Sequence, residues 1–523
     1  LWVANKVSTS TASDVVKGKL TEDICLNACD EGESVLTSEG ALNGDGADFT
    51  QWTPISVAYG VTVVLDGDNK KISGLYINDS DAGTGSSVGL FGVSSGTLTV
   101  SNLSLVDSYI MGYQNVGSLV GSSAGPLTVK NVLNSASVAA TLINAGGLVG
   151  NTGSSETYIE SSGNLGSVAS LGTSVGDYPG ASPAGFIACA IGGQVTITKS
   201  FNKGAVSGFN NNAGGFVGYA DGVTISITQS YNDGLVSGTW GAGGLLGSVY
   251  SSDEDDVVTL ANVYNTADVN GTGAVAGLVG DMNGFKGKAL YITNSYSSGR
   301  ILKSMKVILD ENGNPDKGAW GYGGLVGYAG NAKAKLSIVD SYFDVETFVG
   351  RTVGDVYASV DGVDEFADLE RSSTEFADGT IAKLLHDYNA DGVDGSMWGQ
   401  NVTLENSVPT FTDVQSHKVG PVAYIEGKDG FESVHVDGSF TGNFELPEDV
   451  IINTPVSIAR NFPTVEGENT YSTVMFPFNA EVIPEGVSVY EFDGVTQTDG
   501  KWSVNMKIAD AIVANKPYLV QVK

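Results

Sequence analysis

The phrase glycine–apolar–apolar–glycine recurs along the chain, and this repetition restricts the fold more than any other feature of the sequence. Complete copies occupy 89–92, 147–150, 215–218, 244–247, 277–280 and 324–327, and degenerate copies surround Leu119 and Phe186. The Leu or Phe of each copy stands at 90, 119, 148, 186, 216, 245, 278 and 325, so that the spacings are 29, 29, 38, 30, 29, 33 and 47 residues. A unit of about thirty residues with insertions cannot bury an apolar face by itself, and successive units must therefore stack.

A second row of residues follows the glycine phrase at a nearly fixed offset. The row consists of Asn134, Asn164, Asn202, Asn232 and Asn265, and Ser297 continues it. An aliphatic residue stands five positions before and four positions after each member, and the surrounding residues alternate, as in Val195-Thr-Ile197-Thr. This period of two predicts short strands separated by turns. We expect the asparagines to form a ladder of side-chain amides that bond from coil to coil.

These patterns predict an all-β protein, a right-handed β-solenoid (β-helix) whose lumen is filled by Val, Ile and Leu. We expect N-terminal entry coils or a cap over 1–80 and the repeats over 81–345. A C-terminal cap over 346–413 would carry one short helix, because residues 375–386 place apolar side chains at helical spacing with Asp378 as N-cap. Alternating segments at 472–478, 487–492 and 517–520 predict a β-sandwich-like domain over 414–523.

One unit resembles a known repeat in detail. The Gly-Leu-Val-Gly phrase together with Ser-Tyr-Asn-Asp-Gly-Leu-Val-Ser-Gly at 230–238 is similar to the GLUG repeat of bacterial surface proteins. Residues 52–55 and 65–75 resemble the entry coils that precede such repeats, so the resemblance extends from about residue 50 to about residue 410. The family includes adhesin-like proteins and non-catalytic parts of IgA-directed metallopeptidases. The resemblance therefore implies a GLUG-type solenoid placed outside the cell, and no single activity.

Composition limits the partners and the compartment. Acidic residues outnumber basic ones 59 to 26, and the formal net charge of −33 excludes a basic nucleic-acid groove as the main function. The cysteines are Cys25, Cys29 and Cys189, which allow at most one bridge. In an oxidising compartment that bridge would be Cys25–Cys29, with Cys189 a small buried apolar residue. No apolar run is long enough for a transmembrane helix. The start at Leu1, without Met or a basic region, predicts a mature exported chain.

Catalytic patterns are weak. A zinc peptidase needs His-Glu-x-x-His, and the histidines, which are His386, His417 and His435, are not so spaced. The adjacent pair Asp255-Asp256 lies in an acidic insertion, which we interpret as a solvated loop. We therefore expect no enzymatic activity, and a β-solenoid carbohydrate-active enzyme is the alternative.

Two patterns suggest binding. Asp387, Asn389 and Asp391 alternate as in the first half of an EF-hand loop, and we propose calcium as their ligand, although Trp398 stands where the closing Glu belongs. A polar turn without metal is the alternative. Trp240 and Trp320 each stand five residues before the Leu of a glycine phrase. They would occupy equivalent turns and stack on the sugars of a polysaccharide, or else pack against their own coils.

The combined hypothesis is a secreted or cell-surface structural or adhesive protein. Its partners would be copies of itself, in an extracellular filament or layer, or surface glycans or proteins. Leu1-Trp2-Val3 suggests an uncapped apolar strand, which would complete a neighbouring subunit's sheet or pair with its own first coil. The alternative function is a glycan-binding module of a polysaccharide-degrading bacterium.

Overall fold

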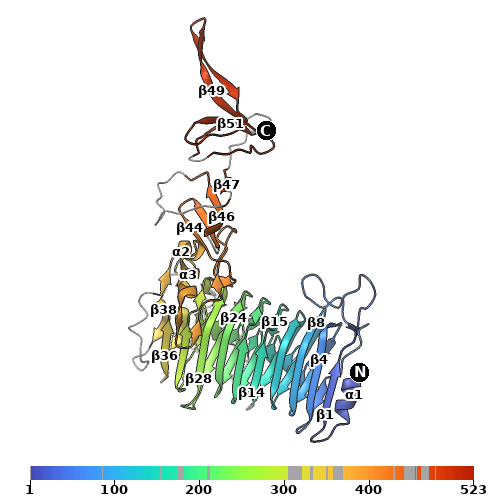
Figure 1. The fold of residues 1–523 in the computed structure, drawn as a ribbon. Helices are drawn as coiled ribbons and strands as arrows, with labels where there is room; N and C mark the ends of the chain where they lie inside the picture. The colour runs from blue at the N-terminus through green and yellow to red at the C-terminus, as the bar shows by residue number, and fades with distance from the viewer. Residues whose placement is uncertain are drawn as a thin grey trace, which may run out of the picture. The chain divides into compact units, whose positions relative to one another are not determined.

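The chain divides into two compact units, Leu1–Gln415 and Ser416–Lys523, and each is described by itself. The structure is a computed structural model (Figure 1), and it describes residues 2–84, 86–153, 156–172, 182–208, 212–303, 321–329, 334–348, 351–356, 369–427, 430–440, 454, 456–460, 470–476 and 479–522. Within these residues, no helix is both long enough and apolar enough to span a membrane.

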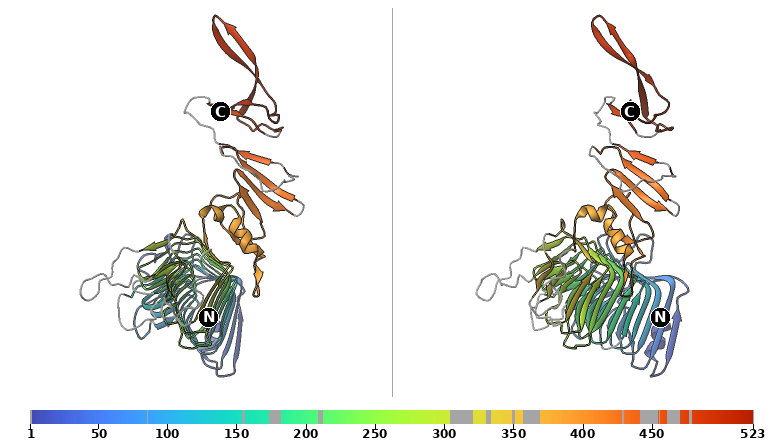
Figure 2. Two further views of the ribbon diagram at one scale, coloured as in Figure 1. Left: turned by 90° about the vertical axis from the view of Figure 1, so that its left-hand side faces the viewer. Right: turned by 60° about the vertical axis from the view of Figure 1, so that its left-hand side comes forward.

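The first unit is a β-solenoid built from two sheets, in which every strand pairs with its neighbours in parallel (Figures 1 and 2). The first sheet contains β1 (Val15–Lys19), β2 (Ile24–Cys25), β4 (Thr62–Ser73), β8 (Thr97–Val106), β11 (Leu127–Asn134), β14 (Glu156–Glu160), β15 (Gly163–Asn164), β19 (Gln194–Thr198), β20 (Phe201–Asn202), β24 (Thr224–Asn232), β28 (Val257–Asn265), β32 (Ala289–Thr293), β33 (Tyr296–Ser297), β36 (Lys335–Val339), β37 (Tyr342–Asp344) and β39 (Glu370–Arg371). 

The second sheet carries the remainder of each coil. Its strands are β3 (Ile55–Val57), β5 (Tyr76–Asp79), β6 (Ser86–Val88), β7 (Phe91–Ser94), β9 (Tyr109–Gly117), β10 (Val120–Ser123), β12 (Ser137–Gly146), β13 (Val149–Thr152), β16 (Val168–Ser170), β17 (Pro183–Ala184), β18 (Ile187–Ile191), β21 (Val206–Gly208), β22 (Ala213–Gly214), β23 (Val217–Asp221), β25 (Val236–Ser237), β26 (Gly241–Gly243), β27 (Leu246–Tyr250), β29 (Val269–Gly271), β30 (Ala274–Ala276), β31 (Val279–Asp281), β34 (Ile301–Lys303), β35 (Tyr322–Ala329) and β38 (Arg351–Val356).

The register places like residues on like residues, as the repeat predicts. Ile197 pairs with Ile159 on one side and Ile227 on the other, and all three side chains are buried in the lumen. Val206 likewise pairs with Val168 and Val236. The predicted β-solenoid with an aliphatic lumen is confirmed.

The asparagine ladder is confirmed as well. Asn164 Nδ2 donates to Asn202 Oδ1 over 2.8 Å, Asn202 Nδ2 to Asn232 Oδ1 over 2.7 Å, and Asn232 Nδ2 to Asn265 Oδ1 over 2.7 Å. These four side chains are fully buried. Each ladder amide therefore forms a hydrogen bond to the next coil in a place from which water, the competing hydrogen-bond partner, is excluded.

The glycine that opens the repeat phrase is required by the ladder in several coils, namely Gly147, Gly185, Gly215 and Gly244, where an added Cβ atom would meet a ladder asparagine. A Cβ atom at Gly185 would lie 2.2 Å from the carbonyl oxygen of Gly215 and 2.4 Å from Oδ1 of Asn202. Both neighbours belong to the rigid interior of adjacent coils. Any larger residue at this position would force the coils apart.

The N-terminus corrects one expectation. Residues 2–8 form a helix, α1 (Trp2–Ser8), and not the free strand that Leu1-Trp2-Val3 suggested. Val3 and Val7 are four residues apart, which is helical spacing, and both pack against the apolar core. The helix thereby covers the first coil, so strand addition through this segment has no structural basis.

Residues 369–415, called here the return segment, correct a second expectation. The predicted helix over 375–386 is two short helices, α2 (Ser373–Ala377) and α3 (Thr380–Asp387), because Gly379 breaks them with a φ of 94°. Asp378 is not an N-cap residue but the C-cap of α2, whose N-cap is Ser372. Short strands follow, β40 (Asn389–Ala390), β41 (Val393–Asp394), β42 (Trp398–Gly399) and β43 (Thr410–Phe411).

The return segment begins with β39, which pairs with β37 at the end of the first sheet, and from α2 onward it packs along the flank of the solenoid. Its Phe376, Ile381, Leu385 and Trp398 form one buried cluster with tyrosines of three successive coils, Tyr264, Tyr296 and Tyr342. The tyrosines present an apolar strip on the flank, and burial of that strip determines where the segment lies.

The second unit contains two sheets of four strands among the described residues. The first is β44 (Ser416–Val419), β45 (Val422–Gly427), β46 (Gly430–Asp437) and β47 (Val456–Ala459). The second is β48 (Thr470–Val474), β49 (Val487–Thr498), β50 (Lys501–Ile508) and β51 (Tyr518–Val522). A buried apolar cluster that includes Val474, Val489 and Val520 lies in the second sheet and its flanking loops.

Candidate functional site

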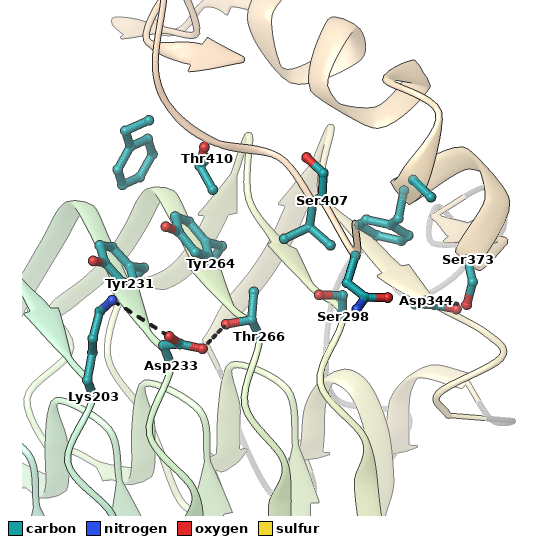
Figure 3. A pocket seen from close by; sticks show the side chains of 15 residues that line it. Lys203, Tyr231, Asp233, Tyr264, Thr266, Ser298, Asp344, Ser373, Ser407 and Thr410 are labelled. Carbon is teal, nitrogen blue, oxygen red and sulfur yellow. Dashed lines mark hydrogen bonds and ion pairs between the residues drawn. The ribbon is translucent and has the colours of Figure 1, made fainter. Parts of the chain in front are cut away.

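A groove of about 750 Å³ lies between the flank of the solenoid and the return segment (Figure 3). One wall consists of the residues that directly follow the ladder positions in successive coils, and the other consists of residues 406–411 and α2. The first wall presents Lys203, Asp233, Thr266, Ser298 and Asp344.

The fold holds this first wall, called here the flank row, at one residue per coil. The amide of Asp233 donates to the carbonyl of Asn202 over 2.7 Å, and the amide of Thr266 donates to that of Asn232 over 3.0 Å. The backbone is thus fixed to the previous coil, while the side chains of Lys203 and Asp233 are exposed, those of Thr266 and Ser298 are half-buried, and that of Asp344 is buried. Neighbouring members are about 4.8 Å apart along the solenoid axis, which is the spacing of paired strands.

A stack of aromatic rings runs parallel to the flank row, one residue before each ladder position. Tyr231 lies 5.6 Å from Phe201 and 4.7 Å from Tyr264, and Tyr264 lies 5.2 Å from Tyr296, between ring centroids. Tyr231 and Tyr264 line the groove. Burial raises the pKa of Tyr264, because the phenolate would lose its hydration. The phenol of Tyr264 therefore stays neutral at physiological pH.

The charged groups in the groove all have partners within the protein. Thr266 Oγ1 donates to Asp233 over 2.8 Å, and Lys203 Nζ lies 3.9 Å from the same carboxylate (Figure 3). Asp344 accepts a hydrogen bond of 2.6 Å from Ser373 Oγ at the start of α2. The site is therefore rich in hydroxyl groups, with one ion pair and one further carboxylate, that of Asp344, whose hydrogen bond comes from a neutral hydroxyl.

The second wall is positioned by the aromatic stack. Tyr296 donates its hydroxyl to the carbonyl of Pro409 over 2.5 Å, and Phe411 packs edge-on against Tyr264 with 5.2 Å between centroids. These contacts hold Ser407 and Thr410 over the groove. The sequence contains one signal for this arrangement, since Phe201, Tyr231, Tyr264, Tyr296 and Tyr342 recur in register, and the prediction of binding residues overlooked it.

The structure places one of the two predicted sugar-stacking tryptophans. Trp240 is partly exposed in the turn before β26, and its carbonyl accepts the amide of Ala274 over 2.6 Å. Trp320 lies outside the described residues. Stacking of this pair on a polysaccharide stays a prediction.

The predicted calcium ligands lie at the end of α3 and in the hairpin that follows. Asp387 accepts a hydrogen bond of 2.9 Å from Lys383, Asn389 pairs with Asp394, and Asp391 occupies a left-handed turn with a φ of 53°. In the part of the chain that the structure describes, no group of three or more His, Cys, Asp or Glu residues could hold a metal ion. Calcium binding by Asp387, Asn389 and Asp391 stays a prediction.

The adjacent acids Asp255 and Asp256 do not act as a pair. Asp256 is buried and accepts a hydrogen bond of 2.6 Å from Ser251, whereas Asp255 is exposed. The interpretation as a solvated loop therefore holds for Asp255 and is wrong for Asp256, whose carboxylate is buried and hydrogen-bonded.

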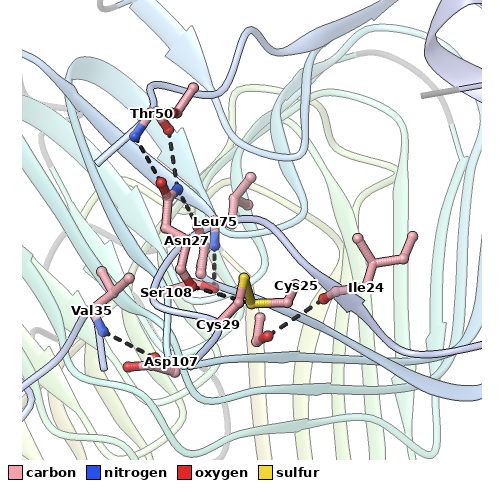
Figure 4. The surroundings of a disulfide bond; sticks show 11 residues. Ile24, Cys25, Asn27, Cys29, Val35, Thr50, Leu75, Asp107 and Ser108 are labelled. Carbon is pink, nitrogen blue, oxygen red and sulfur yellow. Dashed lines mark hydrogen bonds between the residues drawn. A yellow bond between two sulfur atoms is a disulfide. The ribbon is translucent and has the colours of Figure 1, made fainter. Parts of the chain in front are cut away.

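Cys25 and Cys29 form a disulfide, and Cys189 is a buried free cysteine, as the sequence predicts (Figure 4). The disulfide closes a turn around Asn27, whose amide donates to Gly74 over 2.8 Å and accepts from Thr50 over 2.7 Å. The bridge therefore fixes the segment through which the chain enters the solenoid.

A scan against protein-family models finds no family that matches the chain, so the resemblance to the GLUG repeat stays a prediction. A search of curated proteins finds no match. Among solved structures, one similar chain is that of a putative immunoglobulin A1 protease from Bacteroides ovatus. The identity is 15% and the TM-score 0.28, over 78% of this chain and 89% of that chain. A likeness this distant carries no argument about activity.

Proposed function

We propose that the chain is a secreted or cell-surface structural and adhesive protein, which acts by binding macromolecules and not by catalysis. The observation that carries the proposal is that the repeated polar residues serve the framework of the solenoid. Each ladder asparagine is buried and bonded to the next coil. The repeats thus build a stiff frame that displays the side chains of the flank row at a constant spacing. Stacked repeats of this kind form extended binding surfaces.

The disulfide supports extracellular placement. Bridges such as Cys25–Cys29 persist in oxidising compartments and are rare in the cytosol. The resemblance of 230–238 to the GLUG repeat supports the same placement. Partners of the proposed adhesin are glycans or proteins of a host or substrate surface, and the groove on the flank is the described feature best suited to contact them.

Self-assembly into a filament is a weaker part of the proposal. The N-terminal strand that would have carried it is the helix α1, which packs on the first coil. Any polymer would have to form through other surfaces.

The proposal is tested by flowing the purified chain over immobilised mucin, fibronectin and collagen, and over fixed epithelial cells. We expect saturable binding to at least one of these surfaces, and loss of binding after the chain has been unfolded by heat. Mucin incubated with the chain should release no new reducing ends. Absence of saturable binding on every surface would contradict adhesion, and release of sugar would contradict the non-enzymatic assignment.

A further inference from the structure

We propose that the flank groove is a binding site for a short, uncharged oligosaccharide, which lies along the flank row from Lys203 to Ser298. The inference rests on the proposed adhesive function, for which it names a ligand class and a site. The groove combines a cavity of about 750 Å³ with the hydroxyl groups of Thr266, Ser298, Ser373, Ser407 and Thr410.

The dimensions of the groove suit a small number of sugar rings. Its volume of about 750 Å³ falls in the range of small-molecule sites. The row from Lys203 to Ser298 rises by three coils, or about 14 Å at the spacing of paired strands. One coil rises by roughly the length of a pyranose unit. Successive sugars would therefore meet equivalent positions of successive coils.

The polar groups fit hydroxyl ligands. Asp233 has two carboxylate oxygens, and one hydrogen bond from Thr266 uses only part of their accepting capacity. Ser298 on the flank row and Ser407 and Thr410 on the return segment add hydroxyls that donate as well as accept. Sugars require this mixture, because each of their hydroxyls is both a donor and an acceptor.

Aliphatic and phenylalanine side chains line the groove from the return segment, opposite the flank row. Val408 and Phe411 line the groove from the return segment and are half-buried. An apolar wall opposite a polar row matches a sugar ring, whose C–H bonds and hydroxyls point in different directions. The rings of Tyr231 and Tyr264 are stacked along the solenoid, and these two residues therefore contribute their phenol edges to the site.

An anionic ligand fits this groove poorly. The ammonium of Lys203 is paired with Asp233, and Asp344 adds a second carboxylate. The net charge of −33 would further repel phosphate or sulfate groups.

An extended peptide fits poorly too, because strand addition needs unpaired backbone amides. The amides of Lys203, Asp233 and Thr266 already donate to the previous coil. Recognition in this groove must come from side chains.

The experiment begins with an array of tri- to pentasaccharides in three classes, neutral, sialylated and sulfated, probed with the fluorescently labelled full chain. We expect binding to neutral members only. The affinity for the strongest neutral ligand is then measured by calorimetry for the native chain and for Thr266→Leu, Ser298→Leu and Ser407→Leu. The first two variants fill the groove from the flank row, and the third fills it from the opposite wall.

Leucine is compatible with the flank row, since Leu165 follows the ladder residue Asn164 in an earlier coil. Each groove variant should weaken binding about tenfold or more. The matched control is Ser135→Leu, which changes the same row position outside the groove and should bind like the native chain. Melting curves identify any variant that fails to fold. The affinities of the variants that do fold then show whether the groove is the binding site.

The outcomes separate the site from the function. Neutral-glycan binding that all folded groove variants retain would overturn the site and leave adhesion standing. Binding to sulfated or sialylated glycans alone would overturn the ligand class. Absence of binding to any glycan, combined with saturable binding to fibronectin or collagen, would overturn the proposal while adhesion through protein partners stands.

Discussion

Trp398 donates its indole N–H to Oδ1 of Asn262 over 3.0 Å, although 136 positions separate the two residues in sequence. Asn262 is held in a left-handed conformation with a φ of 51°, and the same oxygen accepts Nδ2 of Asn294 from the next coil over 2.7 Å. Asn262 Nδ2 in turn donates to the carbonyl of Asp394 over 2.9 Å. The return segment is thus bonded directly to the turns of the solenoid, and one wall of the groove depends on that bond.

Replacement of Trp398 by Ala should therefore release the return segment. The indole is fully buried against Tyr264 and Tyr296, and its loss should cost about 3–5 kcal/mol of packing. We expect faster proteolytic cleavage within 401–411 while the solenoid stays intact by circular dichroism. Leu404→Ala is the control, because this side chain is exposed in the same segment. Equal cleavage rates in the two variants would contradict this role of Trp398.

The ladder and the return segment differ in how far their contacts could be predicted from the sequence. Asn202 and Asn232 could be predicted to touch because the same residue recurs in every coil, so periodicity alone defines their contact. The bond between Trp398 and Asn262 occurs once and joins distant parts of the chain. Local signals for the segment were present, since Ser372 and Glu375 form a capping box. They define where a helix begins but not the surface that it covers.

The flank row was hidden from sequence reasoning for a similar reason. Lys203, Asp233, Thr266 and Ser298 share a position but no residue type, so no pattern distinguishes them from other exposed residues. Their groove exists only because residues 406–411 return to the same coils.

Replacement of Asn232 by Ala should destabilise the solenoid. Its amide donates to Asn265 and to the carbonyl of Gly234, and it accepts from Asn202, all in the absence of water. Unpaired buried partners cost about 1–3 kcal/mol. Urea unfolding of the variant should show a loss of this size. Asp233→Ala, one residue away and exposed, should change stability by only about 0.5 kcal/mol.

The stability of the chain should depend on pH through Asp281. Burial raises the pKa of Asp281 to about 6 from an ordinary value of 3.8. As the pH rises, this carboxyl ionises at a lower pH in the unfolded chain than in the folded chain. Its contribution to the free energy of unfolding therefore falls between about pH 4 and about pH 6, and it stays low at higher pH. A shift of two units corresponds to about 3 kcal/mol.

Asp281→Asn is the variant that measures this effect. Its amide oxygen still accepts the amide of Asn283, which bonds Oδ1 over 2.7 Å. We expect near-equal free energies of unfolding for variant and native chain at pH 4, and a variant about 2–3 kcal/mol more stable at pH 7. Asp255→Asn, at an exposed position, serves as the control. A difference that is the same at both pH values would contradict the shift.

The three cysteines should react in a fixed order. In the untreated chain no thiol should react with iodoacetamide, because Cys25 and Cys29 are bonded and burial raises the pKa of Cys189 to about 12. Mild reduction should expose Cys25 and Cys29 while the solenoid remains folded. Cys189 should react only after unfolding, and mass spectrometry of the labelled peptides distinguishes the three positions. Labelling of Cys189 in the folded chain would contradict its burial.

The helix α1 should act as a barrier to self-association. A solenoid end presents strand edges that template pairing with other chains unless something covers them. Val7 is 3% exposed against the first coil, whereas Trp2, on the same helix, is 58% exposed. Val7→Asp places a charge in the apolar contact, where it lacks hydration. The helix should then detach, and light scattering coupled to gel filtration should show larger particles than the native chain gives.

Trp2→Asp changes the charge of the helix equally without entering the contact, so its particle size should match that of the native chain. If Val7→Asp leaves the particle size unchanged while circular dichroism shows that the helix is lost, the first coil resists pairing without its cover, and another feature of the end must protect it.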